Sequence, residues 1–92
     1  MENPKISVGI PAYNQAQYLA QCIESVLSQT VKPHEIWICN DGSPDETRYV
    51  ALQYPEIKYI EQVNKGLASA RNTIIMNSKS DYILFLDADD MM

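Results

Sequence analysis

The chain has 92 residues, of which 46% are hydrophobic and 21% charged, which is the composition of one small globular domain rather than of a disordered or fibrous chain. Twelve acidic residues against seven basic ones give a net charge of −5, which argues against a protein that binds nucleic acid. No cationic region followed by a long apolar span occurs near the N-terminus, so we expect neither a signal peptide nor a transmembrane segment.

The first third of the chain predicts a strand followed by a helix. Residues 5–10 alternate β-branched and small side chains, and Pro11 closes this run because proline cannot donate a ladder hydrogen bond. Apolar side chains then recur at helical spacing over residues 17–28. Asn14 and Gln17 have the spacing of a capping box, so we expect them to begin this helix.

The middle of the chain predicts a second strand and a second helix. Residues 35–40 form an apolar run typical of a buried strand. In the turn that follows, Ser43 is the expected N-cap, with Pro44 at the first helical position and Glu46 at the third. We expect this helix to end near Gln53, because a proline follows two residues later.

The last third predicts a short strand at residues 57–61, a helix at residues 67–77 and a fourth strand that starts at Tyr82. Residues 83–86 are all apolar, which favours a strand covered on both faces. Strands that alternate with helices predict an α/β fold with right-handed crossovers: a three-layer, mainly parallel, Rossmann-like sheet. We expect the common strand order 3-2-1-4 in a single domain that spans residues 1–92.

Three carboxylates follow the fourth strand within four residues. The two-residue period of an extended chain places Asp87 and Asp89 on one side, about 7 Å apart, with Asp90 turned away. Two unpaired carboxylates at this distance repel each other, which favours a bound divalent cation with oxygen ligands. A solvated acidic loop after a core strand is the equally simple alternative.

In a sheet of this kind, ligands bind beyond the carboxyl ends of the strands, where the strand order reverses. That crevice would collect residues 11–14, Asp41 with Gly42, and residues 87–90. Neither a glycine-rich dinucleotide turn nor a Walker lysine loop is present. A diphosphate bound here would therefore need a metal ion to screen its charge.

Four blocks of the sequence, in order, resemble those of a family 2 glycosyltransferase of the GT-A fold. They are residues 6–15, 40–45, 64–72 and 81–90. The resemblance implies transfer of a sugar from a nucleoside-diphosphate donor, typically a UDP-sugar, to a saccharide or other acceptor, with Mn²⁺ or Mg²⁺. It also implies a cytoplasmic enzyme, which in its full-length form would be peripheral at the inner face of the membrane. Cys22 and Cys39 both lie in apolar stretches, which fits a reducing compartment.

The resemblance also implies roles for individual residues. Asp41 would contact the nucleobase, Tyr13 would stack on it, and Arg71 would lie near the base or pair with Asp41. In the Asp-X-Asp motif, Asp87 would face the ribose or diphosphate, and Asp89, with Asp87, would bind the metal ion at the diphosphate. The expected substrate-binding residues are Pro11, Ala12, Tyr13, Asn14, Asp41, Gly42, Lys65, Arg71, Asp87 and Ala88.

Each of these roles has a structural alternative. Tyr13 could be a rim tyrosine, and Asp41 could merely begin the turn that leads to Ser43. Asn14 fits a helix cap better than a ligand contact. Lys65 could simply be solvated, and Arg71 could pair with any nearby acid.

The sequence departs from the family pattern in three respects. Asn40 stands where a second acid is frequent, and Thr73 stands where a glycine is frequent. Family members also continue past the Asp-X-Asp motif to an acceptor site and a general base, so we expect that base beyond Met92. The chain is then expected to be an incomplete GT-A domain that binds the donor and is inactive alone.

Two other functions remain open at this stage. A haloacid-dehalogenase-type phosphohydrolase also carries an apolar strand followed by Asp-X-Asp, and would use Asp87 as nucleophile and Asp89 as acid. A non-catalytic nucleotide-binding fragment is the third hypothesis. In any of these cases the fourth strand would lie at an open sheet edge, where an apolar strand favours self-association.

Overall fold

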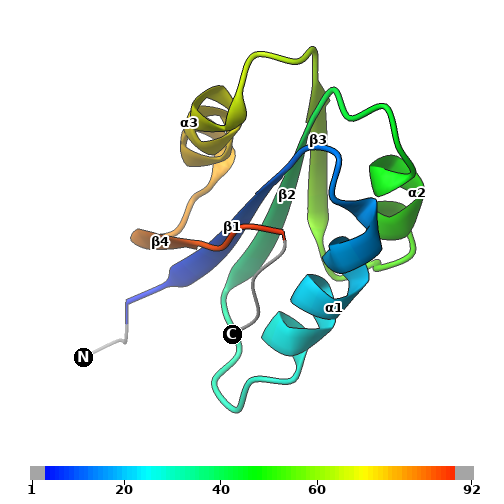
Figure 1. The fold of residues 1–92 in the computed structure, drawn as a ribbon. Coiled ribbons are helices and arrows are strands. Elements are labelled where there is room, and N and C mark those ends of the chain that lie inside the picture. The colour runs from blue at the N-terminus through cyan, green and yellow to red at the C-terminus, as the bar shows by residue number, and fades with distance from the viewer. Residues whose placement is uncertain (1–3, 89–92) are drawn as a thin grey trace.

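The computed structural model describes residues 4–88 and shows one four-stranded sheet with three helices (Figure 1). All neighbouring strands are parallel, and their order is β3-β2-β1-β4. The α/β class and the 3-2-1-4 order predicted from the sequence are therefore confirmed. The elements are β1 (Ile6–Ala12), α1 (Ala16–Leu27), β2 (Glu35–Asp41), α2 (Thr47–Leu52), β3 (Lys58–Gln62), α3 (Leu67–Asn77) and β4 (Tyr82–Phe85).

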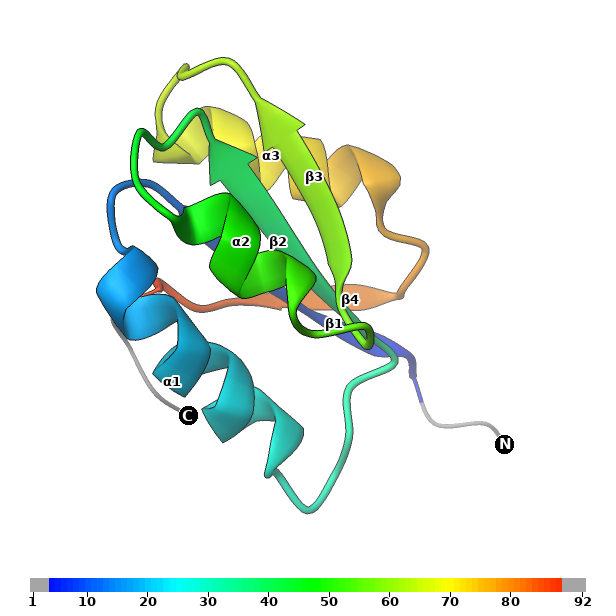
Figure 2. The ribbon, with the colours of Figure 1, turned by 90° about the vertical axis from the view of Figure 1, so that its right-hand side faces the viewer.

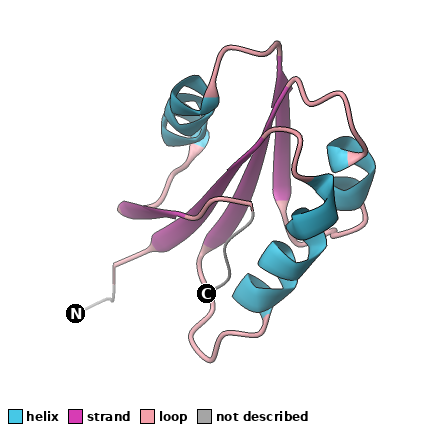
Figure 3. Ribbon diagram, in the orientation of Figure 1, coloured by secondary structure: helices cyan, strands magenta, loops and turns pink. Residues whose placement is uncertain are grey.

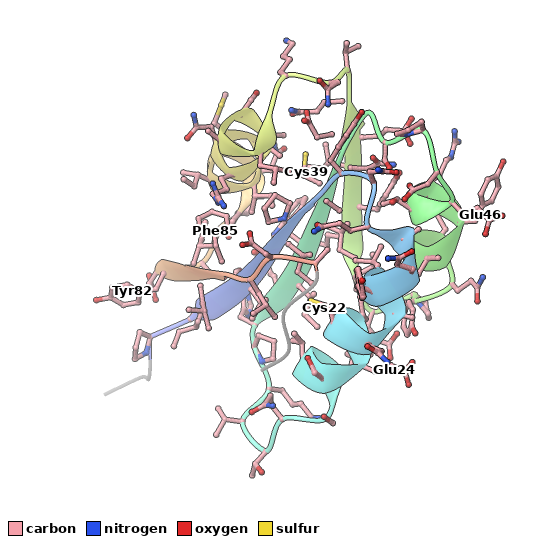
Figure 4. All side chains as sticks on the ribbon, in the orientation of Figure 1. Cys22, Glu24, Cys39, Glu46, Tyr82 and Phe85 are labelled. Carbon is pink, nitrogen blue, oxygen red and sulfur yellow. The ribbon has the colours of Figure 1, made fainter. Side chains whose placement is uncertain are left out.

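The helices cover the two faces of the sheet unequally. Helices α1 and α2 lie on one face and α3 lies on the other, which gives the expected three layers (Figures 1 and 2). The larger core lies under α1 and includes Val8, Ile10 and Ile38, all nearly inaccessible to water. The smaller core, under α3, contains Cys39 and Ile74, with Phe85 packed against it. Figure 4 shows Cys22 on the α1 face of the sheet, opposite Phe85.

A glycine in β1, Gly9, allows side chains to pack closely on the α3 face of the sheet. A Cβ atom at Gly9 would lie 2.8 Å from a ring carbon of Phe85 and 3.1 Å from a methyl group of Ile74. The missing side chain therefore leaves room for the aromatic ring on the α3 face. The pairing continues past the end of β4, since the N–H of Leu86 donates to the carbonyl of Gly9 at 2.9 Å.

The predicted starts of the first two helices are wrong. Helix α1 begins at Ala16 without a side-chain hydrogen bond from its own N-cap, and Asn14 adopts a left-handed conformation with φ of 55° instead of capping. Helix α2 begins at Thr47, not after Ser43. Both starts instead use the carboxylate of Asp45, which accepts the N–H of Ala16 at 3.0 Å and that of Thr47 at 3.1 Å. For α1 this acceptor comes from another loop, so local spacing could not predict it, whereas for α2 it lies only two residues before the helix.

Strand β4 is less buried than its apolar sequence predicts. Ile83 and Phe85 pack against the smaller core, but Leu84 is 48% exposed and Tyr82 is 63% exposed. The side chain of Tyr82 points away from the sheet, at the edge formed by β4 (Figure 4). The expectation of cover on both faces is wrong for the described residues, because α1 and α2 lie over the other strands of this face (Figure 3).

The two cysteines are buried and are not joined by a disulfide. Burial, together with the charge of Asp41, raises the pKa of the Cys39 thiol to about 11. This thiol is therefore protonated at neutral pH and behaves as a small apolar side chain. Within residues 4–88, no helix is long and apolar enough to cross a membrane.

A buried carboxylate organises the amino end of the sheet. Glu35, at the start of β2, accepts hydrogen bonds from Ser7 Oγ at 3.0 Å, Trp37 Nε1 at 3.1 Å and Ser78 Oγ at 3.0 Å. Its second oxygen lies 3.3 Å from Lys58 Nζ. Burial alone would raise the pKa of Glu35, but these donors outweigh it and lower that pKa from 4.5 to about 2.

We predict that Glu35→Gln lowers the free energy of unfolding by about 2 kcal/mol at neutral pH, because charge-assisted bonds are lost. Between pH 4.5 and about 2, the unfolded chain protonates this carboxyl while the folded chain does not. The stabilisation is therefore complete above this range and is lost as the pH falls through it. Urea unfolding at a series of pH values should show the difference from the parent shrinking, with Glu56→Gln at an exposed position as control. A difference that does not change with pH would contradict the assignment.

Candidate functional site

The carboxyl edge of the sheet brings together three segments that are far apart in the sequence. Residues 11–14 form the end of β1 and the turn after it, Asp41 ends β2 and is followed by Gly42, and Asp87 follows β4, which lies next to β1 in the strand order. Figure 2 shows the ends of β2 and β3 pointing to the edge where α3 begins. The expected gathering of these segments is therefore present in the fold.

Asp41 is almost completely buried, with 1% exposure, and both its oxygens are occupied. Oδ1 accepts from Gln62 Nε2 at 2.8 Å and from the backbone N–H of Lys65 at 2.9 Å. Oδ2 accepts from the N–H of Gly66 at 2.8 Å and from Asn64 Nδ2 at 3.1 Å. The carboxylate therefore holds the β3–α3 loop in one shape, a role that was not among the alternatives considered from the sequence.

Gly42 allows this loop to approach β2. Its φ is 67°, and a Cβ atom there would lie 2.6 Å from the backbone nitrogen of Asn64. Any other residue would be strained and would also push the loop away. A second link runs from α3, where Thr73 Oγ1 donates to Gln62 Oε1 at 2.6 Å and Gln62 donates onward to Asp41. Thr73, a departure from the family pattern, thus supports the same carboxylate.

Arg71 and Asp87 form an ion pair across the edge. Arg71 Nη2 lies 3.3 Å from Asp87 Oδ1, and the two side chains are 40% and 49% exposed. Arg71 therefore pairs with a different nearby acid, as one of the alternatives allowed, and not with Asp41, whose carboxylate is filled by donors from β3 and the β3–α3 loop. The carbonyl of Asp87 accepts a weak bond from Cys22 Sγ at 3.7 Å, and Ala88 is fully buried against the α1 core. The segment after β4 thus lies between α3 and α1.

The turn after β1 is fastened to the turn after β2. Pro11 and Ala12 are buried, whereas Tyr13 is 39% exposed at the rim. The N–H of Asn14 donates to Ser43 Oγ at 2.8 Å. Ser43 is itself positioned by Asn40, whose Oδ1 accepts the N–H of Ser43 at 2.9 Å. Asn40, which replaces an acid of the family pattern, is therefore used inside the turn.

Metal binding can be examined only in part from the described residues. Among residues 4–88, no three His, Cys, Asp or Glu side chains are close enough to hold one ion. Asp89, the second expected ligand, lies outside the described residues. Asp87 fits the role in its chemistry, since it offers a half-exposed carboxylate at a strand end and Mn²⁺ or Mg²⁺ takes such oxygen ligands.

Several residues that shape this edge were missed by the sequence analysis. Gln62 and Asn64 contact Asp41, while Ser43 and Asp45 hold the turn that contains Tyr13. Asn64 stood at the head of a family block and could have been identified from it. The other contacts join loops distant in sequence, and no local pattern indicates them.

Comparison with known proteins decides the family. Residues 7–92 match glycosyl transferase family 2. The chain belongs to this family. The family 2 chain is 41% identical over 93 residues to the chondroitin synthase of Escherichia coli, covering 97% of this chain and 14% of that protein. It is 43% identical over 90 residues to the glycosyltransferase GlyA of Streptococcus pneumoniae, covering 94% of this chain and 13% of GlyA.

Solved structures confirm that the family 2 chain has the GT-A fold. S. aureus TarS 1-349 in complex with UDP is similar with a TM-score of 0.86 and 26% identity, covering 95% of this chain and 28% of that one. A mannosyltransferase from Pyrobaculum calidifontis, solved with GDP-Man and Mn²⁺, has a TM-score of 0.84 and 24% identity, covering 98% of this chain and 29% of that one. At this identity the second likeness shows the fold alone.

We predict that Asp41→Asn destabilises the family 2 chain by about 2 kcal/mol, because an amide NH₂ would face donors that now share a carboxylate. Thermal or urea unfolding measures the effect. Asp81→Asn is the matched control, since Asp81 accepts a single exposed bond from the N–H of Lys5 at the opposite edge. Equal stability of the two variants would contradict the role of Asp41 as the anchor of the β3–α3 loop.

Proposed function

We propose that this chain forms the donor-binding part of a glycosyltransferase whose donor is a nucleoside-diphosphate sugar, namely a UDP-sugar. The observation that carries the proposal is the carboxyl edge, where β1, β2 and β4 bring Tyr13, Asp41 and Asp87 together on a family 2 fold. The UDP complex of TarS, at 26% identity, supports uridine as the base. Membership of family 2 favours this function over a phosphohydrolase that would use Asp87 and Asp89.

The base and ribose would lie against the end of β1. Tyr13 is exposed enough at the rim to stack on a base, while the buried Pro11 and Ala12 form the floor below it. We also propose that Asn14, next to Tyr13, contacts the nucleotide in this pocket. Asp41 and Gly42 would bound the pocket on the β2 side, with the carboxylate acting through the loop that it holds.

The diphosphate would lie between the β3–α3 loop and the segment after β4. Lys65 is exposed in that loop, and the half-exposed Arg71 faces Asp87, so both cations are available for phosphate oxygens. We propose that Asp87 and Asp89 hold Mn²⁺ or Mg²⁺, which supplies charge neutralisation for the diphosphate. Ala88, small and buried, would fix the backbone between the two acids.

Transfer to an acceptor is proposed for the whole protein. The relatives named above are many times longer than this chain, which spans 14% and 13% of them. An acceptor surface and a general base would belong to those further parts, so we propose that the 92-residue chain binds the donor without turnover. The buried thiols fit our proposal of a cytoplasmic enzyme, with association at the inner face of the membrane as a further proposal.

We predict that the chain binds UDP in the presence of Mn²⁺ or Mg²⁺ and at least about tenfold more weakly in excess chelator. Tyr13→Ala and Asp87→Asn should each weaken binding about five- to tenfold, through lost stacking and a lost ligand. Isothermal titration calorimetry measures the affinities. Tyr49→Ala, at a 68% exposed tyrosine on α2, and Asp81→Asn are the matched controls.

Equal affinity with and without chelator would contradict the metal proposal alone. Loss of affinity in the Tyr49→Ala control as large as in Tyr13→Ala would contradict the placement of the base.

We also propose that two copies associate through β4. This strand is at the edge of the described sheet and exposes Leu84 at 48% and Tyr82 at 63%, beside Ile6 at 44%. Its backbone therefore offers unpaired groups next to an apolar surface, which favours pairing with a second strand.

We predict that Leu84→Lys shifts the chain toward a monomer by at least about tenfold in dissociation constant, because a lysine there opposes edge pairing. Sedimentation velocity over a concentration series measures the shift. Met76→Lys, at an 84% exposed position on α3, is the matched control. A parent chain that stays monomeric at tens of micromolar would refute the association.

A further inference from the structure

Two loops from different parts of the chain are joined by one carboxylate, that of Asp45. Its Oδ2 accepts the N–H of Ala16 at 3.0 Å, at the start of α1. Its Oδ1 accepts the N–H of Thr47 at 3.1 Å and the hydroxyl of Thr47 at 2.5 Å, at the start of α2. Ser43 also donates its hydroxyl to Oδ1, while its Oγ accepts the N–H of Asn14 at 2.8 Å.

The β1–α1 turn lacks the local hydrogen bonds that would stabilise it. Asn14 has a φ of 55°, a conformation that side chains other than glycine adopt at a cost. The N-cap residue of α1, Gln15, makes no side-chain capping bond. The N–H groups on both sides of Gln15 are instead satisfied by Ser43 and Asp45 from the β2–α2 loop. The residue before Tyr13 is held by the pairing of β1 with β2, and these two acceptors hold the backbone that follows it.

The charge of Asp45 suits this role. Burial would raise the pKa of its carboxyl, but hydrogen bonds from Ser43, Thr47 and two backbone N–H groups lower it to about 2. The group is therefore ionised at neutral pH, and bonds to an ionised acceptor are the stronger kind. The N-terminal ends of α1 and α2 both favour a negative charge at this position. Both oxygens are occupied by protein donors, so Asp45 itself has no need of a ligand.

We propose that Asp45 is a positioning residue of the nucleotide site, which sets the place of Tyr13 by fastening the β1–α1 turn to the β2–α2 loop. The inference rests on the proposed function, because it assigns Tyr13 to the base. It adds that affinity for the nucleotide depends on a carboxylate that does not touch it. Asp45 and Ser43 act together, with Asp45 holding the helix start and Ser43 holding the N–H of Asn14.

The test compares Asp45→Asn with Asp81→Asn, the same change at the opposite edge of the sheet. An asparagine keeps one acceptor oxygen, but its NH₂ group cannot accept a hydrogen bond. It therefore cannot accept hydrogen bonds from both loops on two separate atoms as the carboxylate does. We expect the amide exchange of Asn14 and Ala16 to accelerate about tenfold or more, and the Kd for UDP with Mg²⁺ to rise about fivefold or more. Hydrogen exchange followed by NMR and titration calorimetry measure the two effects. Asp81→Asn should leave both within about twofold.

Ser43→Ala provides a second, milder variant if Asp45→Asn does not fold. It removes the acceptor of the Asn14 N–H, so exchange at Asn14 should accelerate more than exchange at Ala16, again with a higher Kd. A merely structural cap would loosen the turn and leave the Kd unchanged, and this result would overturn the inference. Unchanged exchange at Asn14 and Ala16 would overturn it as well.

The two levels of proposal fail in different ways. If the parent chain binds no UDP, the proposed function fails and the inference fails with it. If the parent binds UDP and Asp45→Asn binds it equally well, only the inference fails. Accelerated exchange together with a raised Kd in both variants, and neither in Asp81→Asn, supports the positioning role.

Discussion

The arrangement of this fold depends on satisfying two buried carboxylates, one at each end of the central strand β2. Glu35, at the amino end, accepts a hydrogen bond from the hydroxyl of Ser78, the C-cap of α3. Asp41, at the carboxyl end, accepts one from the N–H of Gly66, the N-cap of α3. Leaving either carboxylate without donors in a buried position would cost several kcal/mol. Both connections of α3 are therefore drawn to β2, and the helix is held at its two ends by the same strand.

The fixed position of α3 also fixes the side chains that this helix and the following strand carry to the site. Helix α3 carries Arg71, and the strand that follows it carries Asp87 to the neighbouring position at the sheet edge. The remaining wall, with Tyr13, is placed by a third carboxylate, Asp45, from the loop after β2. All three acids lie on β2 or directly after it, so that one strand and its following turn define the positions of the surrounding loops.

Much of the fold could be predicted because apolar runs and prolines act locally. The order of the elements, the parallel sheet and the edge at which β2 and β4 end with Asp41 and Asp87 all followed from them. The helix starts could not, since Asn14 and Ser43 had acceptable capping spacing but the cap came from Asp45. The partner of Arg71 stayed open among several acids, because the sequence does not reveal that four donors already occupy Asp41. The exposure of Leu84 was missed for a similar reason: hydrophobicity indicates what a strand can bury, and not which face a helix covers.

The strand order also has a consequence for the way the chain folds. A single helix separates β1 from β2, so their pairing joins segments that are close in the sequence. The other side of β1 pairs with β4, and the bond between Lys5 and Asp81 closes a loop of 76 residues. Until β4 has been made, one edge of β1 lacks its partner strand. Contacts between segments far apart in the sequence form late in folding, so we expect the pairing of β1 with β4 to be a late step, and it is this pairing that carries Asp87 to the sheet edge.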